Sequence, residues 1–416
     1  MSDAVSAVEG AATPTGPVTL AEIEAARELV REAVIETPVQ GARWLEELTG
    51  APVRFKCENL QRTGSFKSRG AYVRIARLSP EERARGVVAA SAGNHAQGVA
   101  LAAQRLGIPA TVFMPEGAPI PKEKATRGYG AVVVFEGRYL EDSLVAARKY
   151  AEETGAVLIH PFDHVDIVAG QGSVGLEILE QVPDVRTIVV PTGGGGLLAG
   201  IALAVKAKNP AVRVVGVQAE GAAAFPGSLA EGQPVALPAM KTMADGIAVG
   251  LPGAITFAAV RDHVDEIRTV SEESLSRALL GVLERAKLVV EPAGAAGVAA
   301  VLDDPAGFPG PTVVVLSGGN IDPLLLNKVI RHGLASAGRY LKLRVVIPDL
   351  PGELAHLLSE VGAAGANVLE VAHARNSPLL SLDQVEVLLQ LETRGEPHAE
   401  QVMDRLRSRG YRVETT

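Results

Sequence analysis

The sequence predicts an α/β protein with open parallel sheets, followed by a smaller domain of ferredoxin-like order. Short runs of apolar and β-branched residues alternate with segments whose apolar residues recur at helical spacing. Runs that are apolar almost throughout are typical of parallel strands that helices cover on both faces. Nearly every run ends in Gly, Ser, Pro or Asn, and the order of the elements changes near residue 335.

The strands and helices of the larger part follow one another in alternation. Thr19 and Glu22 have the spacing of a capping box and predict the start of the first helix, over residues 20–34. Because ligands of open α/β sheets bind at the carboxyl ends of the strands, we expect the chemistry in the turns that follow them. We predict further helices over 71–78 and 196–207, and strands over 53–60, 86–91, 110–115, 131–136, 187–191, 213–220 and 312–318.

Small residues at 331–339 predict a linker to a C-terminal domain that spans residues 340–416. The order of its elements is strand, helix, strand, strand, helix, strand, which is the ferredoxin-like plan. We place its strands over 341–349, 367–375, 384–393 and 411–414, and its helices over 351–365 and 397–410.

Composition and charge exclude several classes of protein. The 416 residues are enough for about two to four domains, and 47% of them are apolar, which is ordinary for a globular protein. There are 40 basic and 48 acidic residues, a net charge of −8, so we expect no nucleic-acid partner. The single cysteine, Cys57, excludes an internal disulfide and a cysteine-built zinc site.

Location is predicted from the segments that would direct a protein elsewhere. No run reaches the length of about 18 apolar residues that a membrane-spanning helix needs, so we expect no membrane partner. Residues 1–18 are small and acidic and lack the features of a signal peptide, and we expect a flexible tail there. These observations predict a cytoplasmic protein. The histidines show no paired metal-ligand spacing, so we expect no metal site.

Segment 61–70, QRTGSFKSRG, places a lysine where a helix begins after a strand. Ser65 can cap that helix, and Lys67 then lies in its first turn, where the positive potential of backbone N–H groups can lower its pKa. A lowered pKa is what a Schiff-base lysine needs, because only the neutral amine attacks a carbonyl group. The alternative is a solvated lysine at the surface of the protein.

Two further turns supply polar and anion-binding groups. In 91–98, SAGNHAQG, the Asn94 amide offers donors and an acceptor to a ligand, or it caps a helix. In 191–200, PTGGGGLLAG, four consecutive glycines let the N–H groups of a helix start approach a phosphate closely. That loop also matches the G-x-G-x-x-A pattern of dinucleotide-binding proteins, with Glu220 ending the next strand. An NAD-dependent dehydrogenase is therefore an alternative.

The four turns become specific when they are taken together. The fourth, 317–320 with the sequence SGGN, ends a strand with a hydroxyl and two glycines, whereas His160, ADGIA at 244–248 and EPAGA at 291–295 have simpler structural interpretations. A glycine loop can hold a phosphate, a lysine can form an imine, an asparagine can hold a phenolate oxygen, and a serine can meet a ring nitrogen. These are the groups of pyridoxal 5′-phosphate.

These segments, with HPFD at 160–163, resemble the β-family (fold type II) of pyridoxal-phosphate enzymes, and within it the threonine dehydratases, also called threonine ammonia-lyases. The resemblance covers residues 19–330 in chain order and implies two α/β subdomains, the smaller one roughly residues 60–160. Residues 340–416 are similar to an ACT-type regulatory domain in a single copy, as in the medium-length form of these enzymes.

The resemblance also implies roles for individual residues. Lys67 corresponds to the Schiff-base lysine, Asn94 to the partner of the cofactor 3′-oxygen, and Ser317 to the partner of the pyridine nitrogen. Because a serine is no carboxylate counter-ion, we expect a neutral ring, which favours elimination over transamination. Phe66 lies beside the lysine, as in relatives. The implied phosphate loop is Gly193, Gly194, Gly195, Gly196 and Leu197, and the implied substrate site is Ser91, Ala92, Gly93, Asn94 and His95.

The implied reaction is dehydration and deamination of L-threonine to 2-oxobutanoate and ammonia, and of L-serine to pyruvate, in isoleucine biosynthesis or threonine catabolism. The alternative is an enzyme of the same fold that is a serine dehydratase, a racemase or a dehydratase of another hydroxy-amino acid. Racemases carry a second serine at the position of Ala92 and an asparagine at that of Phe162, so racemisation is disfavoured. Most of the acidic cluster that holds a divalent ion in relatives is missing after Glu220, and a monovalent cation stays open. The ACT-type domain implies a homodimer or homotetramer. The resemblance also implies that isoleucine inhibits the enzyme and that valine relieves this inhibition.

Overall fold

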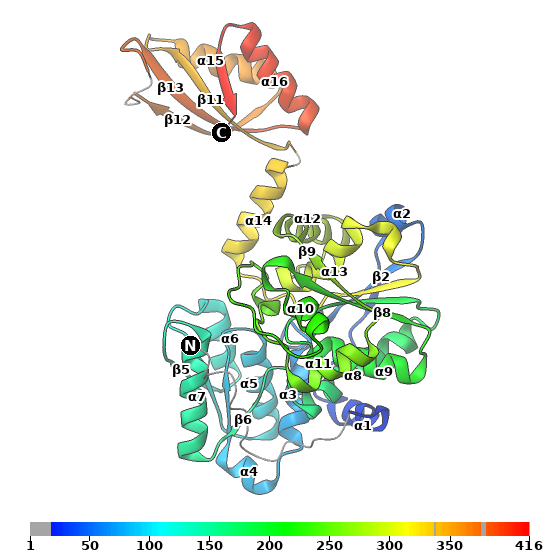
Figure 1. Ribbon diagram of the computed structural model, residues 1–416. Coiled ribbons are helices and arrows are strands. Elements are labelled where there is room, and N and C mark those ends of the chain that lie inside the picture. Colours follow the sequence, from blue (N-terminus) through cyan, green and yellow to red (C-terminus); the bar gives the residue numbers. More distant parts are fainter. Residues whose placement is uncertain (1–17, 337, 376–379, 416) are drawn as a thin grey trace. The chain divides into compact units, whose positions relative to one another are not determined.

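The computed structural model describes residues 18–336, 338–375 and 380–415, which form two compact units (Figure 1). The first unit extends to Asp322, and the second runs from Pro323 to Thr416. Of the predicted flexible tail, residues 1–17 lie outside the described residues. Val18 is described, and its side chain is buried in the core of the first unit.

A six-stranded sheet forms the centre of the first unit, and it is parallel except for its edge strand β1. Every residue of β7 is buried, as expected for a strand that helices cover on both faces. The strand β2 ends at Lys56, earlier than predicted, because Glu58–Leu60 form a 3-10 turn. In spatial order the strands are β1 (Val39–Gly41), β2 (Val53–Lys56), β10 (Thr312–Val315), β7 (Thr187–Pro191), β8 (Arg213–Ala219) and β9 (Glu266–Val270).

A second, smaller sheet in the same unit is parallel throughout. Alternate residues of β3 point to opposite faces, so Ala89 packs with α5 (Asn94–Leu106) and Val88 packs with α7 (Leu140–Thr154). These two sheets confirm the fold class predicted from the sequence. In spatial order the strands are β5 (Val132–Phe135), β4 (Ala110–Met114), β3 (Val87–Ala90) and β6 (Val157–Leu158).

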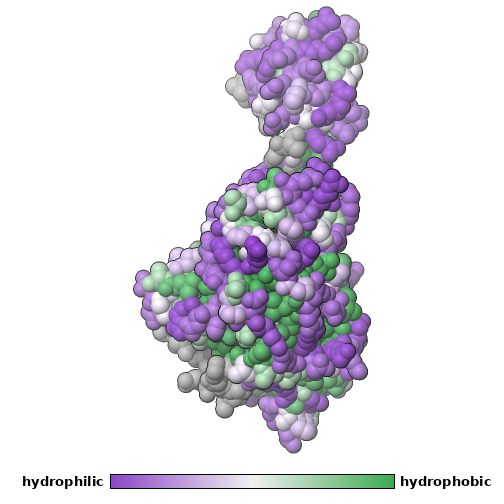
Figure 2. All heavy atoms as spheres, turned by 90° about the vertical axis from the view of Figure 1, so that its right-hand side faces the viewer, coloured by the Kyte–Doolittle hydropathy of each residue, from purple (hydrophilic) through white to green (hydrophobic). Residues whose placement is uncertain are grey.

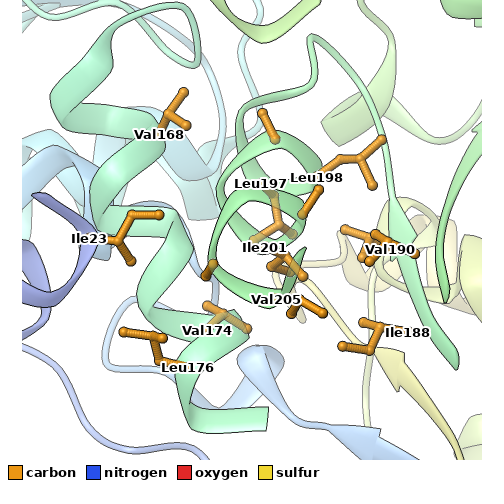
Figure 3. Close-up of a cluster of buried hydrophobic side chains, with 14 of the residues drawn as sticks. Ile23, Val168, Val174, Leu176, Ile188, Val190, Leu197, Leu198, Ile201 and Val205 are labelled. Carbon is orange, nitrogen blue, oxygen red and sulfur yellow. The ribbon is translucent and has the colours of Figure 1, made fainter. Parts of the chain in front are cut away.

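The largest apolar core lies between the larger sheet and three helices, α1 (Leu20–Val30), α8 (Val165–Gln181) and α9 (Gly196–Lys208) (Figure 3). Glycines allow α8 and α9 to pack closely. A Cβ atom at Gly200 would lie only 2.5 Å from the carbonyl oxygen of Val168. The other helices of the unit are α2 (Arg43–Thr49), α3 (Lys67–Ala76), α4 (Pro80–Arg85), α6 (Ile120–Gly128), α10 (Ala224–Glu231), α11 (Ala254–His263), α12 (Glu272–Gly281) and α13 (Pro292–Asp303).

Four charged side chains are buried next to α3 and neutralise one another. The Arg69 guanidinium donates to the carboxylates of Glu58 and Glu177 at 2.5 to 2.9 Å. Lys56 Nζ donates to Glu177 Oε2 at 2.5 Å. Burial raises the pKa of Glu58, but the charges of Arg69 and Lys56 outweigh burial and bring this pKa below its usual value. The network therefore joins β2, α3 and α8, and it fixes the helix that begins at Lys67.

The second unit has the predicted β-α-β-β-α-β order, with an antiparallel sheet in the order β12-β13-β11-β14. Polar residues cover most of the face that Figure 2 shows of this unit. The part of the predicted linker before residue 337 is helical, because α14 (Pro323–Ser336) continues through Leu334 and Ala335, which are good helix formers. The remaining elements are β11 (Tyr340–Pro348), α15 (Glu353–Ala363), β12 (Asn367–Ala374), β13 (Gln384–Glu392), α16 (Glu396–Ser408) and β14 (Arg412–Thr415).

Within the described ranges, none of the helices combines the length and the apolar character that crossing a membrane requires.

We expect Arg69→Met to lower the free energy of unfolding of the protein by about 3–5 kcal/mol, because it leaves two buried carboxylates without their main counter-charge. Urea unfolding followed by circular dichroism measures this loss. Arg43 is the matched control, since its ion pair with Glu47 lies on the surface at 3.0 Å. Arg43→Met is expected to cost roughly 0.5 kcal/mol or less. Equal losses in the two variants would show that the buried network contributes no more than a surface pair.

Candidate active site

A cavity of about 440 Å³ lies between the two sheets of the first unit, at the carboxyl ends of their strands. Several helices begin at its wall, among them α3 at Lys67, α5 at Asn94, α9 at Gly196 and α13 at Pro292. The structure brings together every residue that the sequence placed in the site. These are Phe66, Lys67, Ser91, Ala92, Gly93, Asn94, His95, Gly193, Gly194, Gly195, Gly196, Leu197 and Ser317.

Lys67 is the first residue of α3 and points into the cavity. Its Nζ donates a hydrogen bond to the carbonyl oxygen of Pro161 at 2.8 Å. Burial lowers the pKa of Lys67 to about 8, and the charge of Glu291 partly offsets that effect. The direction agrees with the sequence analysis, but the cause is burial. The predicted cap is wrong, because the residue at the N-cap position is Phe66 and the buried Ser65 hydroxyl has no hydrogen-bond partner among the described residues.

The glycine loop has no room for side chains. A Cβ at Gly194 would lie 2.4 Å from the ring of Phe162, and one at Gly195 would lie 2.7 Å from Phe225. Gly195 also has a φ of +94°, a conformation that glycine adopts readily. The loop leads directly into α9, whose first N–H groups have no partner inside the helix. An anion bound here meets those groups and the positive end of the helix dipole.

Asp163, the last residue of HPFD, supports the glycine loop indirectly, through the first residues of α11. Its carboxylate accepts hydrogen bonds from the backbone N–H groups of Ala254, Ile255 and Thr256 at 2.9 to 3.2 Å, and thereby caps α11. The Thr256 hydroxyl in turn donates to the carbonyl oxygen of Gly194 at 2.6 Å. Sequence reasoning did not give Asp163 this role, because the helix that it caps is more than 90 residues away in the chain.

A chain of amides fixes the orientation of Asn94. Asn320 Nδ2 donates both to the carbonyl oxygen of Thr63, at 2.7 Å, and to Asn94 Oδ1, at 2.8 Å. Because Asn94 Oδ1 is an acceptor in this contact, its Nδ2 must be the group that faces the cavity. That group donates to Glu291 Oε1 at 2.6 Å. Asn320 is the last residue of the predicted SGGN turn, which therefore contributes more than Ser317.

Glu291 is a buried carboxylate in the cavity wall that the sequence analysis assigned to a structural turn. Burial and the nearby charge of Asp245 raise the pKa of Glu291 to about 7. The charge of Lys122, the hydrogen bond from Asn94 and the charge of Lys67 act in the opposite direction. Its sequence signal was an acidic residue between the apolar residues 288–290 and a proline that begins a helix.

The two histidines of the cavity wall are neutral. Burial lowers the pKa of His95 and that of His160 to about 3, and the charge of Lys67 adds to the effect in both. His160 Nδ1 accepts the backbone N–H of Asp163 at 2.7 Å, so its proton is on Nε2. Among the residues that the structure describes, no three His, Cys, Asp or Glu side chains gather where they could hold a metal ion.

The arrangement can bind two anions and present a reactive amine between them. The starts of α9 and α5 are the anion sites, and Lys67 supplies an amine that is partly neutral near pH 8. Glu220, the expected ribose-binding acid of the dinucleotide alternative, is exposed and does not line the cavity. The geometry therefore favours a cofactor that carries a phosphate and a carbonyl group.

Comparison with known proteins gives consistent results. Residues 30–319 match the family described as pyridoxal-phosphate dependent enzyme. The chain is 48% identical to an L-threonine ammonia-lyase of Geobacter sulfurreducens, over 96% of this chain and 99% of the relative. It is 47% identical to an L-threonine ammonia-lyase of Thermotoga maritima, over 95% of this chain and 99% of the relative.

Two solved structures resemble the first unit. The structure of maize serine racemase has a TM-score of 0.72 and 37% identity, over 77% of this chain and 99% of that one. The crystal structure of a T.th. threonine deaminase has a TM-score of 0.70 and 44% identity, over 73% of this chain and 99% of that one. The protein belongs to the family of pyridoxal-phosphate-dependent enzymes.

Proposed function

We propose that this protein is an L-threonine ammonia-lyase that converts L-threonine to 2-oxobutanoate and ammonia, and L-serine to pyruvate. The observation that carries the proposal is the placement of Lys67 opposite the glycine loop in one cavity. Two relatives of that name, similar over nearly the full length of the chain, support the choice of substrate.

The residues of the cavity fit pyridoxal 5′-phosphate. Residues 193–197 would hold its phosphate, Lys67 would bond its carbonyl carbon, and Asn94 and Ser317 would contact the ring oxygen and nitrogen. The ring of Phe162 leaves no space for a Cβ at Gly194, so the loop has glycine there and a phosphate can approach its N–H groups closely. When bound, the cofactor withdraws electrons from the carbon that loses a proton.

Lys67 is the group that moves this proton. Its lowered pKa makes the neutral amine accessible near physiological pH, so Nζ can accept the α-proton of the amino acid. The Pro161 carbonyl oxygen holds Nζ in the cavity at 2.8 Å. The substrate carboxylate would bind the N–H groups at the start of α5, in the segment from Ser91 to His95.

Ala92 favours elimination over racemisation. It lines the cavity with Lys67, and its methyl group can neither donate nor accept a proton. Phe162 also lines the cavity, with its ring 4.7 Å from that of His160 in an edge-to-face arrangement. A racemase needs two bases on opposite faces of the substrate, so the likeness to maize serine racemase is one of fold and cofactor rather than of outcome.

We extend the proposal to regulation and assembly. The β-α-β-β-α-β order of the second unit supports an ACT-type domain over residues 340–416, joined at residues 331–339 to a catalytic part over 19–330. In this proposal a smaller subdomain at roughly 60–160 carries Lys67. The enzyme is a cytoplasmic homodimer or homotetramer that acts in isoleucine biosynthesis or threonine catabolism. Isoleucine inhibits it, and valine relieves the inhibition.

Lys67→Ala is expected to remove the visible absorbance of the lysine-bound cofactor and to reduce threonine turnover by at least about a thousandfold, because no other amine takes both roles. Spectra of purified protein, followed by detection of the 2-oxoacid after addition of L-threonine, measure both effects. Lys149→Ala, at an exposed position of α7, is the control. Full turnover in Lys67→Ala would refute the assignment of the lysine.

Ser317→Asp is expected to raise the frequency of side transamination several-fold per elimination event, because a carboxylate keeps the pyridine nitrogen protonated. The readout is the rate of inactivation during turnover and its reversal by added 2-oxoacid. Ser317→Ala is the control, since it removes the hydroxyl without adding a charge. An unchanged partition ratio in Ser317→Asp would contradict a neutral ring.

Asp163→Ala is expected to weaken cofactor binding roughly fivefold to thirtyfold, because the loss of a helix cap releases Thr256 and with it the glycine loop. Titration of cofactor-free protein with pyridoxal phosphate measures the dissociation constant. Asp262→Ala, at an exposed position of the same helix, should leave it unchanged. Identical affinities in the two variants would disprove the support of the loop by Asp163.

A further inference from the structure

An ion pair lies in the wall of the cavity, between a buried lysine and an aspartate whose side chain is 60% exposed. Lys122 lies on α6, which packs on α5 beside the smaller sheet, and its Nζ donates to Asp245 Oδ2 at 2.6 Å. Asp245 begins a 3-10 turn, Asp245–Ile247, that packs against α13 beside the larger sheet. Both residues line the cavity, and the Lys122 side chain is only 11% exposed. The pair therefore joins the two sheet layers of the first unit at the site itself.

Glu291 is held between this ion pair and Lys67. Its carboxylate lies against two glycines, since a Cβ at Gly318 would be 2.4 Å from Oε1 and one at Gly246 would be 3.3 Å from the same atom. Gly246 directly follows Asp245, so the turn that carries Asp245 also forms the wall behind Glu291. The backbone N–H of Glu291 donates to the carbonyl oxygen of Gly318 at 3.0 Å, which fixes the residue at the start of α13.

Two positive charges, one negative charge and one amide act on Glu291. Lys67 on α3 and Lys122 on α6 favour its ionised form, and Asp245 opposes it, while Asn94 on α5 donates a hydrogen bond to it. Burial and the charge of Asp245 raise the pKa of Glu291 to about 7. Small changes in the neighbouring charges therefore change the protonation of Glu291 at neutral pH.

We propose that Lys122 and Asp245 are positioning residues whose ion pair sets the charge of Glu291, and that this charge in turn sets how much of Lys67 is neutral whenever its amine is not bonded to the cofactor. The proposal rests on the proposed function only for its kinetic readout. When Glu291 is ionised it stabilises the ammonium form of Lys67, and when it is protonated that stabilisation is lost. The ion pair thus acts on the reactive amine through a carboxylate and not by contact.

Two variants test the proposal because they act in opposite directions. Lys122→Met removes a positive charge and leaves Asp245 unpaired, so the pKa of Glu291 should rise. Asp245→Asn removes a negative charge and frees Lys122, so this pKa should fall. We expect the pKa to move by about 0.5 to 1 in each direction. A general loosening of the fold would move both variants the same way.

The primary readout is independent of turnover. Infrared spectra of the full-length protein loaded with pyridoxal phosphate, recorded across pH, give the carbonyl stretch of protonated Glu291 as the difference from a Glu291→Gln variant. The secondary readout is the pH profile of kcat/KM with L-threonine. We expect both readouts to shift to higher pH in one of the two variants and to lower pH in the other.

Lys206→Met is the matched control. Lys206 forms an ion pair with Asp265 at 2.7 Å, and its side chain is 16% exposed, a fraction similar to that of Lys122. However, Lys206 lies on α9 and does not line the cavity. It should leave both readouts at their wild-type pH. In a Glu291→Gln background, Lys122→Met and Asp245→Asn should no longer displace the kinetic profile in opposite directions.

The outcomes separate this inference from the proposed function. Infrared shifts in the same direction, or none, would overturn the inference even if the enzyme turns over threonine. Opposite infrared shifts in a protein that does not act on threonine would support the inference and refute the proposed function. Opposite kinetic shifts that persist in Glu291→Gln would overturn it as well, because the ion pair would then act through another group.

Discussion

The active-site cavity exists because several helices of the first unit begin at the same place. Each helix start presents N–H groups without helical partners and the positive end of a dipole, so their convergence creates a pocket that attracts anions and disfavours ammonium ions. The helix starts converge only because the carboxyl ends of the strands in the two sheets face each other. The buried network of Arg69, Glu58, Glu177 and Lys56 maintains that arrangement next to Lys67, since it joins one strand and two helices through charges that solvent cannot replace.

Burial gives the site its chemistry as well as its shape. It keeps His95 and His160 neutral, brings the pKa of Lys67 down to about 8 and brings that of Glu291 up to about 7. The pKa of the lysine is lowered and that of the glutamate is raised, so the two values approach each other around neutral pH. In water both groups would be fully charged at neutral pH, whereas in this cavity both change protonation near that pH.

The fold and the principal site residues could be predicted because their signals are local. Four glycines after an apolar strand, or a lysine at a helix start, are visible in a few adjacent residues. The role of Glu291 depends on Asn94, Asp245 and Gly318, which come from distant segments, so no short pattern reveals it. The prediction that Ser65 caps α3 was wrong for the same reason. Ser65 pairs with Gly318, which comes from a distant segment of the chain. Part of the predicted linker proved helical because small residues such as alanine are compatible with both states.

The contact between Phe162 and Gly194 has a consequence for the exchange of segments among related enzymes. The aromatic ring occupies the space that a side chain on the loop would need, and it comes from a segment about thirty residues earlier in the chain. Loop and ring are therefore two halves of one steric unit. A chimaera that places this glycine loop in a relative with a smaller residue at position 162 would gain a void beneath the loop, whereas transfer of both segments together would preserve the packing.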